Sequence, residues 1–302
     1  MELTVRGIRD TDVDAIIGFT QETWADREVG DHIPRVLEDW LESEGDTQKT
    51  FVLDAGDDIA GLCQGVLLSD HEAWAQGMRV NPAFRGNGVS RTLTNTLFDW
   101  AAQQGATVAR NMVYSWNIGG LGQSRATGFA PATEFRWAKP EPDADARPEL
   151  TVEADPAAAW SYWNRSDART HLVGLGLDLN ESWALSELTL DKLRALAADD
   201  AVFAVKADGT RAMAYRNRTF EHTNDEGETR RYAEYGVGAW EDAAAARSLF
   251  AALSRDAAEL GADNARVLIP ETVRHVSDVA TARVPVSSEP DFVLEADLTT
   301  RR

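Results

Sequence analysis

Residues 80–93 read VNPAFRGNGVSRTL, and this stretch decides how the fold is interpreted. An apolar, strand-like run precedes it, Asn81-Pro82 predicts a turn, and a helical pattern begins at Val89. The first amides of a helix have no acceptor within the helix, and together with the helix dipole they attract anions. Gly86 and Gly88 leave the backbone amides uncovered, so we expect the loop to bind a phosphate or a pyrophosphate.

Two common phosphate loops do not fit this stretch. The Walker type requires G-x-x-x-x-G-K-(S/T), a run that the chain lacks. The dinucleotide type requires a third glycine at the position where Arg91 stands. The anion site is therefore of another kind.

The flanking sequence predicts a mixed α/β fold in the first half of the chain. Periodicity and turn residues predict strands at 3–8, 50–53, 59–68, 74–80, 107–114 and from 129 onward, and helices at 13–24, 33–41, 89–104 and 117–127. The expected order is β-α-α-β-β-β-α-β-α-β.

The loop resembles the acyl-CoA loop of the GNAT acetyltransferases. That family carries (Q/R)-x-x-G-x-(G/A) after V-x-P; here Val80-Asn81-Pro82 leads into Arg85 to Ser90, with Ser90 replacing the usual small residue. The family also begins a later helix with Asn and ends it with Gly-Phe, as Asn117 and Gly128-Phe129 do here. The resemblance covers about residues 1–140 and implies acetyl-CoA as cosubstrate and a primary amine as acceptor.

The resemblance also implies which residues contact the cofactor. The backbone of one strand, and Asn117, should contact the pantetheine arm, while the loop amides should bind the pyrophosphate. The implied cofactor residues are Met78, Arg79, Val80, Arg85, Gly86, Asn87, Gly88, Val89, Ser90, Arg91 and Asn117. The thioester should lie where the fourth and fifth strands splay apart, with its oxygen near an amide of Arg79 or Val80.

The catalytic acid and base are left open by the sequence. Many family members place a Tyr acid seven residues after the Asn, where this chain has Ser124, and Tyr114 is a possible substitute. Alternate residues of a strand share a face, so Glu72 is expected on the face of Met78 and Val80 and could act as base.

The acceptor pocket has several candidate residues. Glu22, Glu28 and Asp31 lie around the first two helices, where the family recognises its acceptor, and each is also a plausible surface carboxylate. Trp116 directly precedes Asn117 and is the best aromatic candidate.

A Pro- and Asp-rich linker at 141–149 divides the chain into an expected cofactor domain, 1–140, and a second domain, 150–302. Residues 247–269 (RSLFAALSRDAAELGADNARVLI) share with residues 91–113, without gaps, the Arg, two Leu, Ala-Ala, Gly-Ala and Ala-Arg. This similarity predicts an internal duplication, so we expect two tandem GNAT-like lobes, each a mixed central sheet flanked by helices.

The second lobe has lost the loop residues. At the same offset, Glu241, Asp242 and Ala244 stand in place of Arg85, Gly86 and Gly88, and Val273 stands in place of Asn117. Two carboxylates would repel a pyrophosphate, so we expect this copy to be degenerate and to bind no cofactor.

Composition and charge exclude several classes of protein. The net charge of −20 opposes nucleic-acid binding and suits a salt-rich cytosol, which predicts a halophilic source. The start MELTVRGIRD lacks a signal pattern and no run is long enough for a membrane span, so we expect a cytoplasmic protein. Cys63 is the one cysteine, and the five histidines lack metal-ligand spacing, so no metal is expected.

The sequence therefore predicts an acetyl-CoA-dependent N-acetyltransferase, a monomer or a homodimer. Two alternatives remain: a non-catalytic acyl-CoA-binding or regulatory module, favoured by Ser124, and a mycothiol-synthase-like tandem acetyltransferase, in which the second lobe would be needed.

Overall fold

The computed structural model describes residues 3–21, 23–24, 30–223 and 227–301. By its contacts the chain forms two compact units. Unit 1 comprises Met1–Val113, Asn117–Pro131 and Leu294–Arg302, and unit 2 comprises Tyr114–Trp116 and Ala132–Val293. Each unit is described by itself below.

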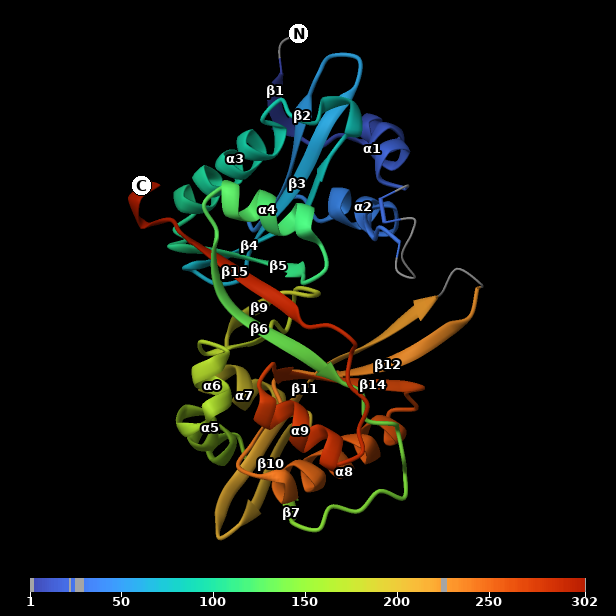
Figure 1. The fold of residues 1–302 in the computed structure, drawn as a ribbon, viewed down its shortest axis with the longest axis vertical. Coiled ribbons are helices and arrows are strands. Elements are labelled where there is room, and N and C mark those ends of the chain that lie inside the picture. Colours follow the sequence, from blue (N-terminus) through green and yellow to red (C-terminus); the bar gives the residue numbers. More distant parts are fainter. Residues whose placement is uncertain (1–2, 22, 25–29, 224–226, 302) are drawn as a thin grey trace. The chain divides into compact units, whose positions relative to one another are not determined.

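The elements of the first half follow the expected order (Figure 1). They are β1 (Thr4–Gly7), η1 (Asp10–Asp12), α1 (Val13–Thr20), α2 (Ile33–Glu42), β2 (Gln48–Asp54), β3 (Ile59–Leu67), β4 (Glu72–Val80), η2 (Pro82–Phe84), α3 (Val89–Gln103), β5 (Val108–Tyr114), α4 (Ile118–Ala126) and β6 (Ala130–Ala138). Helix α1 is shorter than predicted: it ends at Thr20, and Trp24 has a left-handed φ of 60° that no helix accommodates.

Unit 1 is built on a mixed sheet with the order β1-β2-β3-β4-β5. Strands β1 to β4 pair antiparallel, and β4 pairs parallel with β5. Helices cover both faces. On one face Ile16, Ile33 and Leu37 of α1 and α2 pack with Leu62 in a buried cluster.

The other face of this sheet is covered by α3. A methyl group on Gly61 would lie 2.8 Å from Val89, and one on Gly65 would lie 2.7 Å from Trp100. The sheet glycines therefore allow α3 to approach β3 closely, which fixes where α3 begins.

Unit 2 also contains a mixed sheet with helices. The elements after residue 150 are β7 (Thr151–Glu153), α5 (Pro156–Arg165), α6 (Asp167–His171), β8 (Leu175–Leu177), β9 (Leu185–Glu187), α7 (Leu190–Ala197), β10 (Val202–Ala207), β11 (Gly209–Thr223), β12 (Thr229–Tyr235), β13 (Ala239–Trp240), α8 (Ala243–Glu259), β14 (Asn264–Pro270), α9 (Val273–Thr281), β15 (Asp291–Asp297) and η3 (Thr299–Arg301). Of these, the end of β15 and η3 belong to unit 1. The sheet order of unit 2 is β7-β10-β11-β12-β14-β6, with β12 and β14 parallel. Residues 139–150 form no helix or strand.

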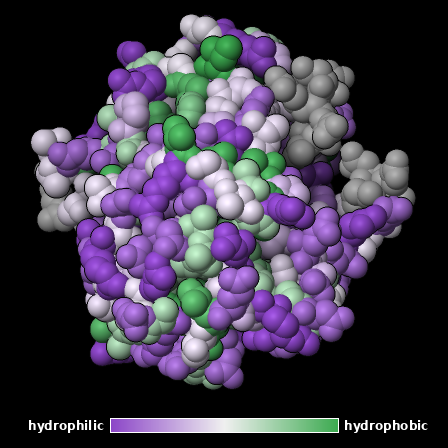
Figure 2. All heavy atoms as spheres, turned by 60° about the horizontal axis from the view of Figure 1, so that its bottom comes forward, coloured by the Kyte–Doolittle hydropathy of each residue, from purple (hydrophilic) through white to green (hydrophobic). Residues whose placement is uncertain are grey.

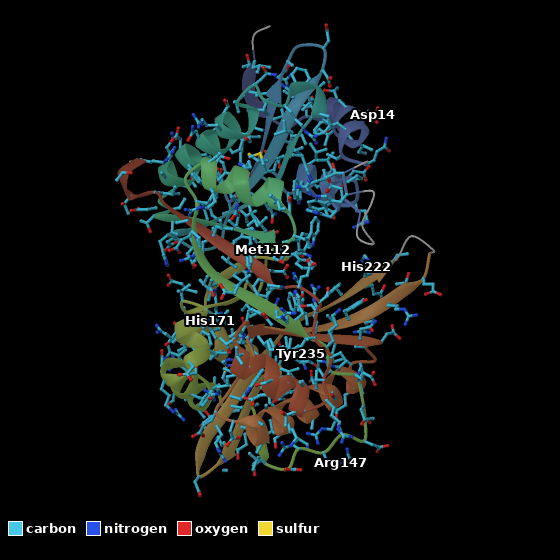
Figure 3. All side chains as sticks on the ribbon, in the orientation of Figure 1. Asp14, Met112, Arg147, His171, His222 and Tyr235 are labelled. Atoms are coloured by element: carbon cyan, nitrogen blue, oxygen red, sulfur yellow. The ribbon has the colours of Figure 1, made fainter. Side chains whose placement is uncertain are left out.

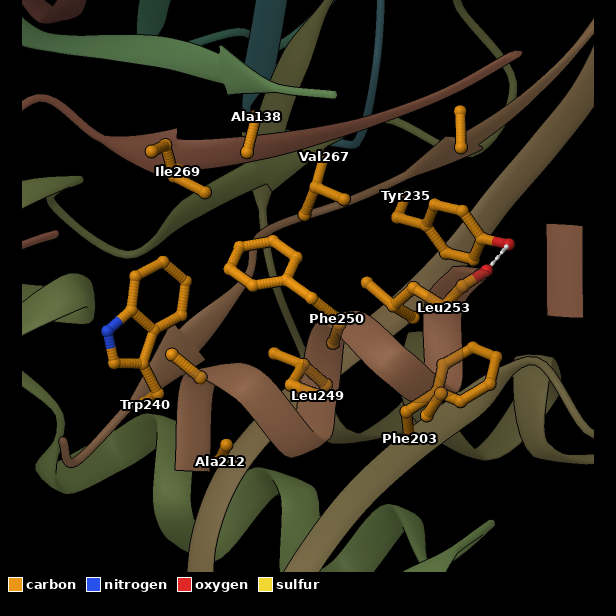
Figure 4. Close-up of a cluster of buried hydrophobic side chains, with 14 of the residues drawn as sticks. Ala138, Phe203, Ala212, Tyr235, Trp240, Leu249, Phe250, Leu253, Val267 and Ile269 are labelled. Atoms are coloured by element: carbon orange, nitrogen blue, oxygen red, sulfur yellow. Dashed lines mark hydrogen bonds between the residues drawn. The ribbon is translucent and has the colours of Figure 1, made fainter. Parts of the chain in front are cut away.

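The core of unit 2 lies between this sheet and α8. Leu249, Phe250 and Leu253 of α8 pack against Val267 and Ile269 of β14 (Figure 4). Tyr235 is fully buried there, and its hydroxyl donates to the Leu253 carbonyl at 3.1 Å. A buried phenol is tolerated because it is hydrogen-bonded.

The two units exchange their last strands. Residues of β6, from the first half of the chain, pair antiparallel with β14 in unit 2. The end of β15, from the second half, belongs to unit 1 and neighbours β5. The Leu298 amide donates to the Thr107 carbonyl at 2.9 Å, and Arg301 bonds Asp99 and Asn95 of α3 at 2.9 Å each. The sequence suggested a single domain boundary in the linker at 141–149. One boundary there does not account for this exchange of strands.

The surface drawn in Figure 2 is mainly hydrophilic. Hydrophilic side chains dominate the face drawn in Figure 2, and hydrophobic ones are scattered among them. Among the described residues, no helix combines the length and the apolar character that a membrane span would need.

Candidate functional site

The candidate site lies at the N-terminus of α3, in the segment Arg85–Arg91, which we call the α3 loop. Gly86 has φ of 81° and Gly88, the N-cap residue, has φ of 75°. Both values are in the left-handed region that favours glycine. A methyl group on either glycine would have no neighbour within 4 Å, so open space lies in front of the loop.

The backbone amides of the α3 loop are arranged as an anion would require. No side chain caps α3, and its first helical bond runs from the Thr92 amide to the Gly88 carbonyl at 3.0 Å. The amides of Gly86, Gly88, Val89, Ser90 and Arg91 have no acceptor within the described part of the chain. A helix start with unmatched amide donors and no capping side chain can accommodate an anion.

The side chains of the α3 loop fit the same role. Arg85 and Arg91 are exposed, and neither forms an ion pair with another described residue, although the chain is strongly acidic. Asn87 braces the loop by donating to the Phe84 carbonyl at 3.1 Å. The loop thus combines a fixed backbone with two free positive charges.

A fork opens in the sheet next to this loop. Strands β4 and β5 pair only at Glu72↔Val108, Ala73↔Ala109 and Trp74↔Arg110. Beyond these pairs, residues 75–80 of β4 and 111–113 of β5 run without mutual ladder bonds, and we call this region the fork. The expected separation of the fourth and fifth strands is therefore present.

A β-bulge at Gly77 determines which side chains face α3. Leu62 pairs with Arg79 but Gln64 pairs with Gln76, so β4 carries one extra residue at this point. Gly77 takes φ of 62°. A one-residue shift moves every later side chain to the opposite face.

The bulge corrects one expectation about β4. Met78 and Val80 lie on the face of Gly61, toward α3, whereas Glu72 shares the opposite face with Trp74. The alternation that put Glu72 beside Met78 and Val80 was wrong, because it assumed a regular strand. Arg79 lies on the α1–α2 face.

Arg79 is held by Asp31. Its Nε donates to Asp31 Oδ2 at 2.7 Å and its Nη2 donates to Asp31 Oδ1 at 2.8 Å, while Trp24 lies over the guanidinium at 4.5 Å. Asp31 also accepts from the Ile33 amide at 3.1 Å at the start of α2. The Arg79 side chain thus joins β4 to α2, and its backbone is the part that borders the fork. Glu22 and Glu28 lie outside the described residues.

Glu72 has a structural partner. It is buried, its Oε1 accepts from Arg110 at 2.7 Å, and its Oε2 accepts from Ser69 at 3.0 Å. It stands at the paired end of β4, before the fork begins. This geometry gives the hypothesis of a Glu72 base no support.

Ser124 is also enclosed. It is 1% exposed on α4, and its hydroxyl oxygen accepts from Asn111 Nδ2 at 3.0 Å. Tyr114 ends β5, stacks on Trp116 with ring centroids 5.2 Å apart, and is grouped with unit 2. These contacts are structural, and neither assigns an acid role to its residue.

Asn117 caps α4. Its Oδ1 accepts from the Gly120 amide at 2.9 Å, which leaves Nδ2 without an acceptor among the described residues. A donor at the start of α4 suits a carbonyl group, as expected for a pantetheine contact.

The equivalent site in unit 2 is filled by the chain itself. Asp242 caps α8 and accepts from the amides of Ala244 at 3.0 Å and Ala245 at 2.9 Å. These amides and Arg211 hold the pKa of Asp242 below its usual range. A carboxylate thus satisfies the helix start that is bare in α3.

Other contacts close the rest of the unit 2 site. The Gly238 amide donates to the Leu268 carbonyl at 2.8 Å, which joins the two strands just where a fork would open. Arg274 of α9 donates to the carbonyls of Trp240 and Glu241. The N-cap of α9 is Thr272, so the structural counterpart of Asn117 is Thr272 rather than Val273, because the connection before α9 is one residue shorter.

Comparisons with known proteins agree with this architecture. Residues 14–119 match the model of the acetyltransferase (GNAT) family. The GCN5-related N-acetyltransferase from Sphaerobacter thermophilus is 13% identical, with a TM-score of 0.62, and the alignment covers 98% of this chain and 96% of that one. A structure from Thermoplasma acidophilum is 16% identical, with a TM-score of 0.58 over 97% of this chain and 99% of the other.

A comparison with curated proteins gives no match. Residues 14–119 are thus similar to the acetyltransferase (GNAT) family, and the whole chain has the mixed α/β fold of the GCN5-related N-acetyltransferase from Sphaerobacter thermophilus.

Proposed function

We propose that unit 1 is an N-acetyltransferase that uses acetyl-CoA and a primary amine. The observation that carries the proposal is the bare start of α3 beside the fork between β4 and β5. The match of residues 14–119 to the acetyltransferase family supports it. Acetyl-CoA, when bound, supplies the thioester carbonyl that the amine attacks.

The residues present fit this cofactor. The amides from Gly86 to Arg91 would hold the pyrophosphate, Arg85 and Arg91 would add charge, and Asn117 Nδ2 would donate to the pantetheine arm. The β4 backbone at Met78, Arg79 and Val80 borders the fork and would line the same arm.

Catalysis in this proposal depends mainly on positioning. Glu72 is bound by Arg110, and Ser124 is enclosed with Asn111, so neither side chain offers a strong base or acid. Holding two reactants in line accounts for a large share of many enzymatic rates. An amide of Arg79 or Val80 in the fork would polarise the thioester oxygen. Tyr114 remains the proposed donor to the leaving sulfur.

We propose that unit 2 is a degenerate copy that binds no cofactor. Its elements follow the order of unit 1 with additions, which are the β8–β9 pair, one further helix before β10, and β13 before α8. Strands β14 and β5 lie at the same offset as the repeated sequence. Asp242 and Gly238 already satisfy the groups that a cofactor would meet. The mycothiol-synthase-like alternative, which needs an active second lobe, is correspondingly disfavoured.

The decisive experiment measures acetyl-CoA binding by titration calorimetry for the wild type, Gly88→Glu and Gly56→Glu. Gly56 is a matched control, since its φ is 90° and it also has no neighbour within 4 Å. We expect only Gly88→Glu to abolish binding, because its carboxylate would meet the pyrophosphate. Equal binding by all three proteins would overturn the α3 loop as the cofactor site.

A second candidate function is a non-catalytic acyl-CoA-binding module, which the enclosed Ser124 favours. A panel of amines with thiol detection separates the two functions. Release of CoA above background with any amine supports the enzyme. Tight binding without release across polyamines, amino acids, aminoglycosides and peptide N-termini supports the module.

We also propose that the protein comes from a halophilic organism, that it is located in the cytoplasm, and that it is a monomer or a homodimer. The acidic, Lys-poor composition supports the first proposal. Screening of self-repulsion should raise the unfolding temperature between about 0.1 and 2 M KCl. An unfolding temperature that falls with KCl would contradict it, and sedimentation tests the oligomeric state.

A further inference from the structure

Asn111 lies at the inner end of the fork. It follows Arg110, the last β5 residue that pairs with β4, and precedes Met112, which is labelled in Figure 3. Arg110 pairs with Trp74 on the α1–α2 face, so Asn111 points to the opposite face. It therefore shares the face of Met78 and Val80, on which α4 also packs.

The side-chain amide of Asn111 is only half satisfied. Its Nδ2 donates to Ser124 Oγ at 3.0 Å. Its Oδ1 is buried and has no hydrogen-bond partner in the part of the chain that the structure describes. A buried carbonyl oxygen without a donor is costly, so such atoms mark a missing ligand or a strained site.

The pairing with Ser124 fixes where the unmatched group points. Ser124 is buried on α4, so the amide cannot rotate away without losing its one partner. Reversing the amide would leave a donor unmatched instead of an acceptor. A secondary amide, which carries an N–H and a carbonyl, matches either orientation.

We propose that Asn111 is a positioning residue for the pantetheine arm and hydrogen-bonds its secondary amide nearest the sulfur. This inference rests on the proposed function. It makes Ser124 the residue that holds Asn111 in place, which accounts for a short, buried side chain at that position. The thioester would then be fixed from the β5 side of the fork as well as from β4.

The test compares two ligands, CoA and 3′-phospho-ADP, which is the nucleotide half of CoA without pantetheine. Asn111→Ala should weaken CoA binding about fivefold, the effect of one neutral hydrogen bond, and should leave 3′-phospho-ADP binding unchanged. Asn217→Ala is the matched control, because Asn217 Oδ1 is another buried oxygen with no partner among the described residues and lies in unit 2. It should change neither affinity.

Asn111→Ala also leaves the buried Ser124 hydroxyl without its partner, so the ligand-free variant should melt at a lower temperature in any case. The independent readout is therefore the rise in melting temperature that each ligand produces: the rise with CoA should be smaller in the variant, and the rise with 3′-phospho-ADP should be unchanged. Wild-type CoA affinity in Asn111→Ala overturns the proposal. So does equal weakening of both ligands, or a raised KM for the amine with unchanged CoA affinity. If the wild type binds neither ligand, the proposed function itself fails.

Discussion

Gly77 of β4 packs against Trp40 of α2 so closely that a methyl group on Gly77 would lie 2.3 Å from the indole ring. Gly77 also has φ of 62°, where a side chain is strained. The bulge that it forms turns Arg79 toward Asp31 and turns Met78 toward α3. One glycine thus determines the two sides of the candidate site.

Gly77→Ala should lower the free energy of unfolding by about 3 kcal/mol or more, because overpacking adds to backbone strain. Gly56→Ala is the control: it has φ of 90° but no neighbour within 4 Å, so strain alone should cost about 1 kcal/mol. Urea unfolding followed by tryptophan fluorescence measures both. Equal losses would show that Trp40 does not constrain the bulge.

Asp31→Asn should destabilise unit 1 by about 3 kcal/mol, because it leaves the buried Arg79 guanidinium without its counter-charge. The exposed pair of Arg301 and Asp99 provides the contrast, and Asp99→Asn should cost less than about 1 kcal/mol. Thermal and urea unfolding of the two variants give the comparison. A larger loss for Asp99→Asn would contradict the ranking.

Asp242→Ala should cost about 1 kcal/mol through loss of the α8 cap. The folded-state pKa of Asp242 is lowered, so its contribution is fully present above the unfolded pKa and is lost as the pH falls through the folded value. The difference between variant and wild type should therefore shrink in acid. A difference that stays constant down to about pH 2 would argue against an ionised cap.

Asp291 should give stability the opposite pH dependence. Burial raises the pKa of Asp291 to about 7, although the hydrogen bond that it accepts from Trp137 Nε1 at 3.2 Å acts to lower that pKa. The folded protein then holds a proton that the unfolded chain has released, so stability falls as the pH rises from about 4 to about 7.

Asp291→Asn keeps an acceptor for Trp137 and removes this titration. It should match the wild type near pH 4 and be more stable by up to about 4 kcal/mol at pH 8. Urea unfolding at closely spaced pH values measures the difference. A flat difference over that range would mean that Asp291 ionises normally.

Local signals predicted much of this fold. Gly86, Gly88 and Asn117 stand where the backbone needs left-handed residues or a cap, and those needs can be read from neighbouring residues alone. These residues allowed the sequence to predict where α3 begins and where β5 begins and ends. The mixed sheet in each unit agrees with the predicted fold class, and the TM-score of 0.62 to a full-length structure supports it.

The errors have non-local causes. The Gly77 bulge depends on the register between β3 and β4, and the Glu72–Arg110 pair joins residues from two different strands. The unmatched oxygen of Asn111 depends on Ser124 of α4. No periodic pattern encodes such contacts. The offset from Asn117 to Val273 failed because one residue is missing before α9.

The exchanged strand has a consequence for synthesis on the ribosome. The loop that would hold the cofactor emerges early, but the sheet beside it lacks β15 until residues 291–297 have been made. An N-terminal domain often folds as soon as it leaves the exit tunnel, whereas unit 1 cannot be completed before the whole of unit 2 has been synthesised. A stop codon just before residue 291 should therefore disable the part of the protein that is translated first.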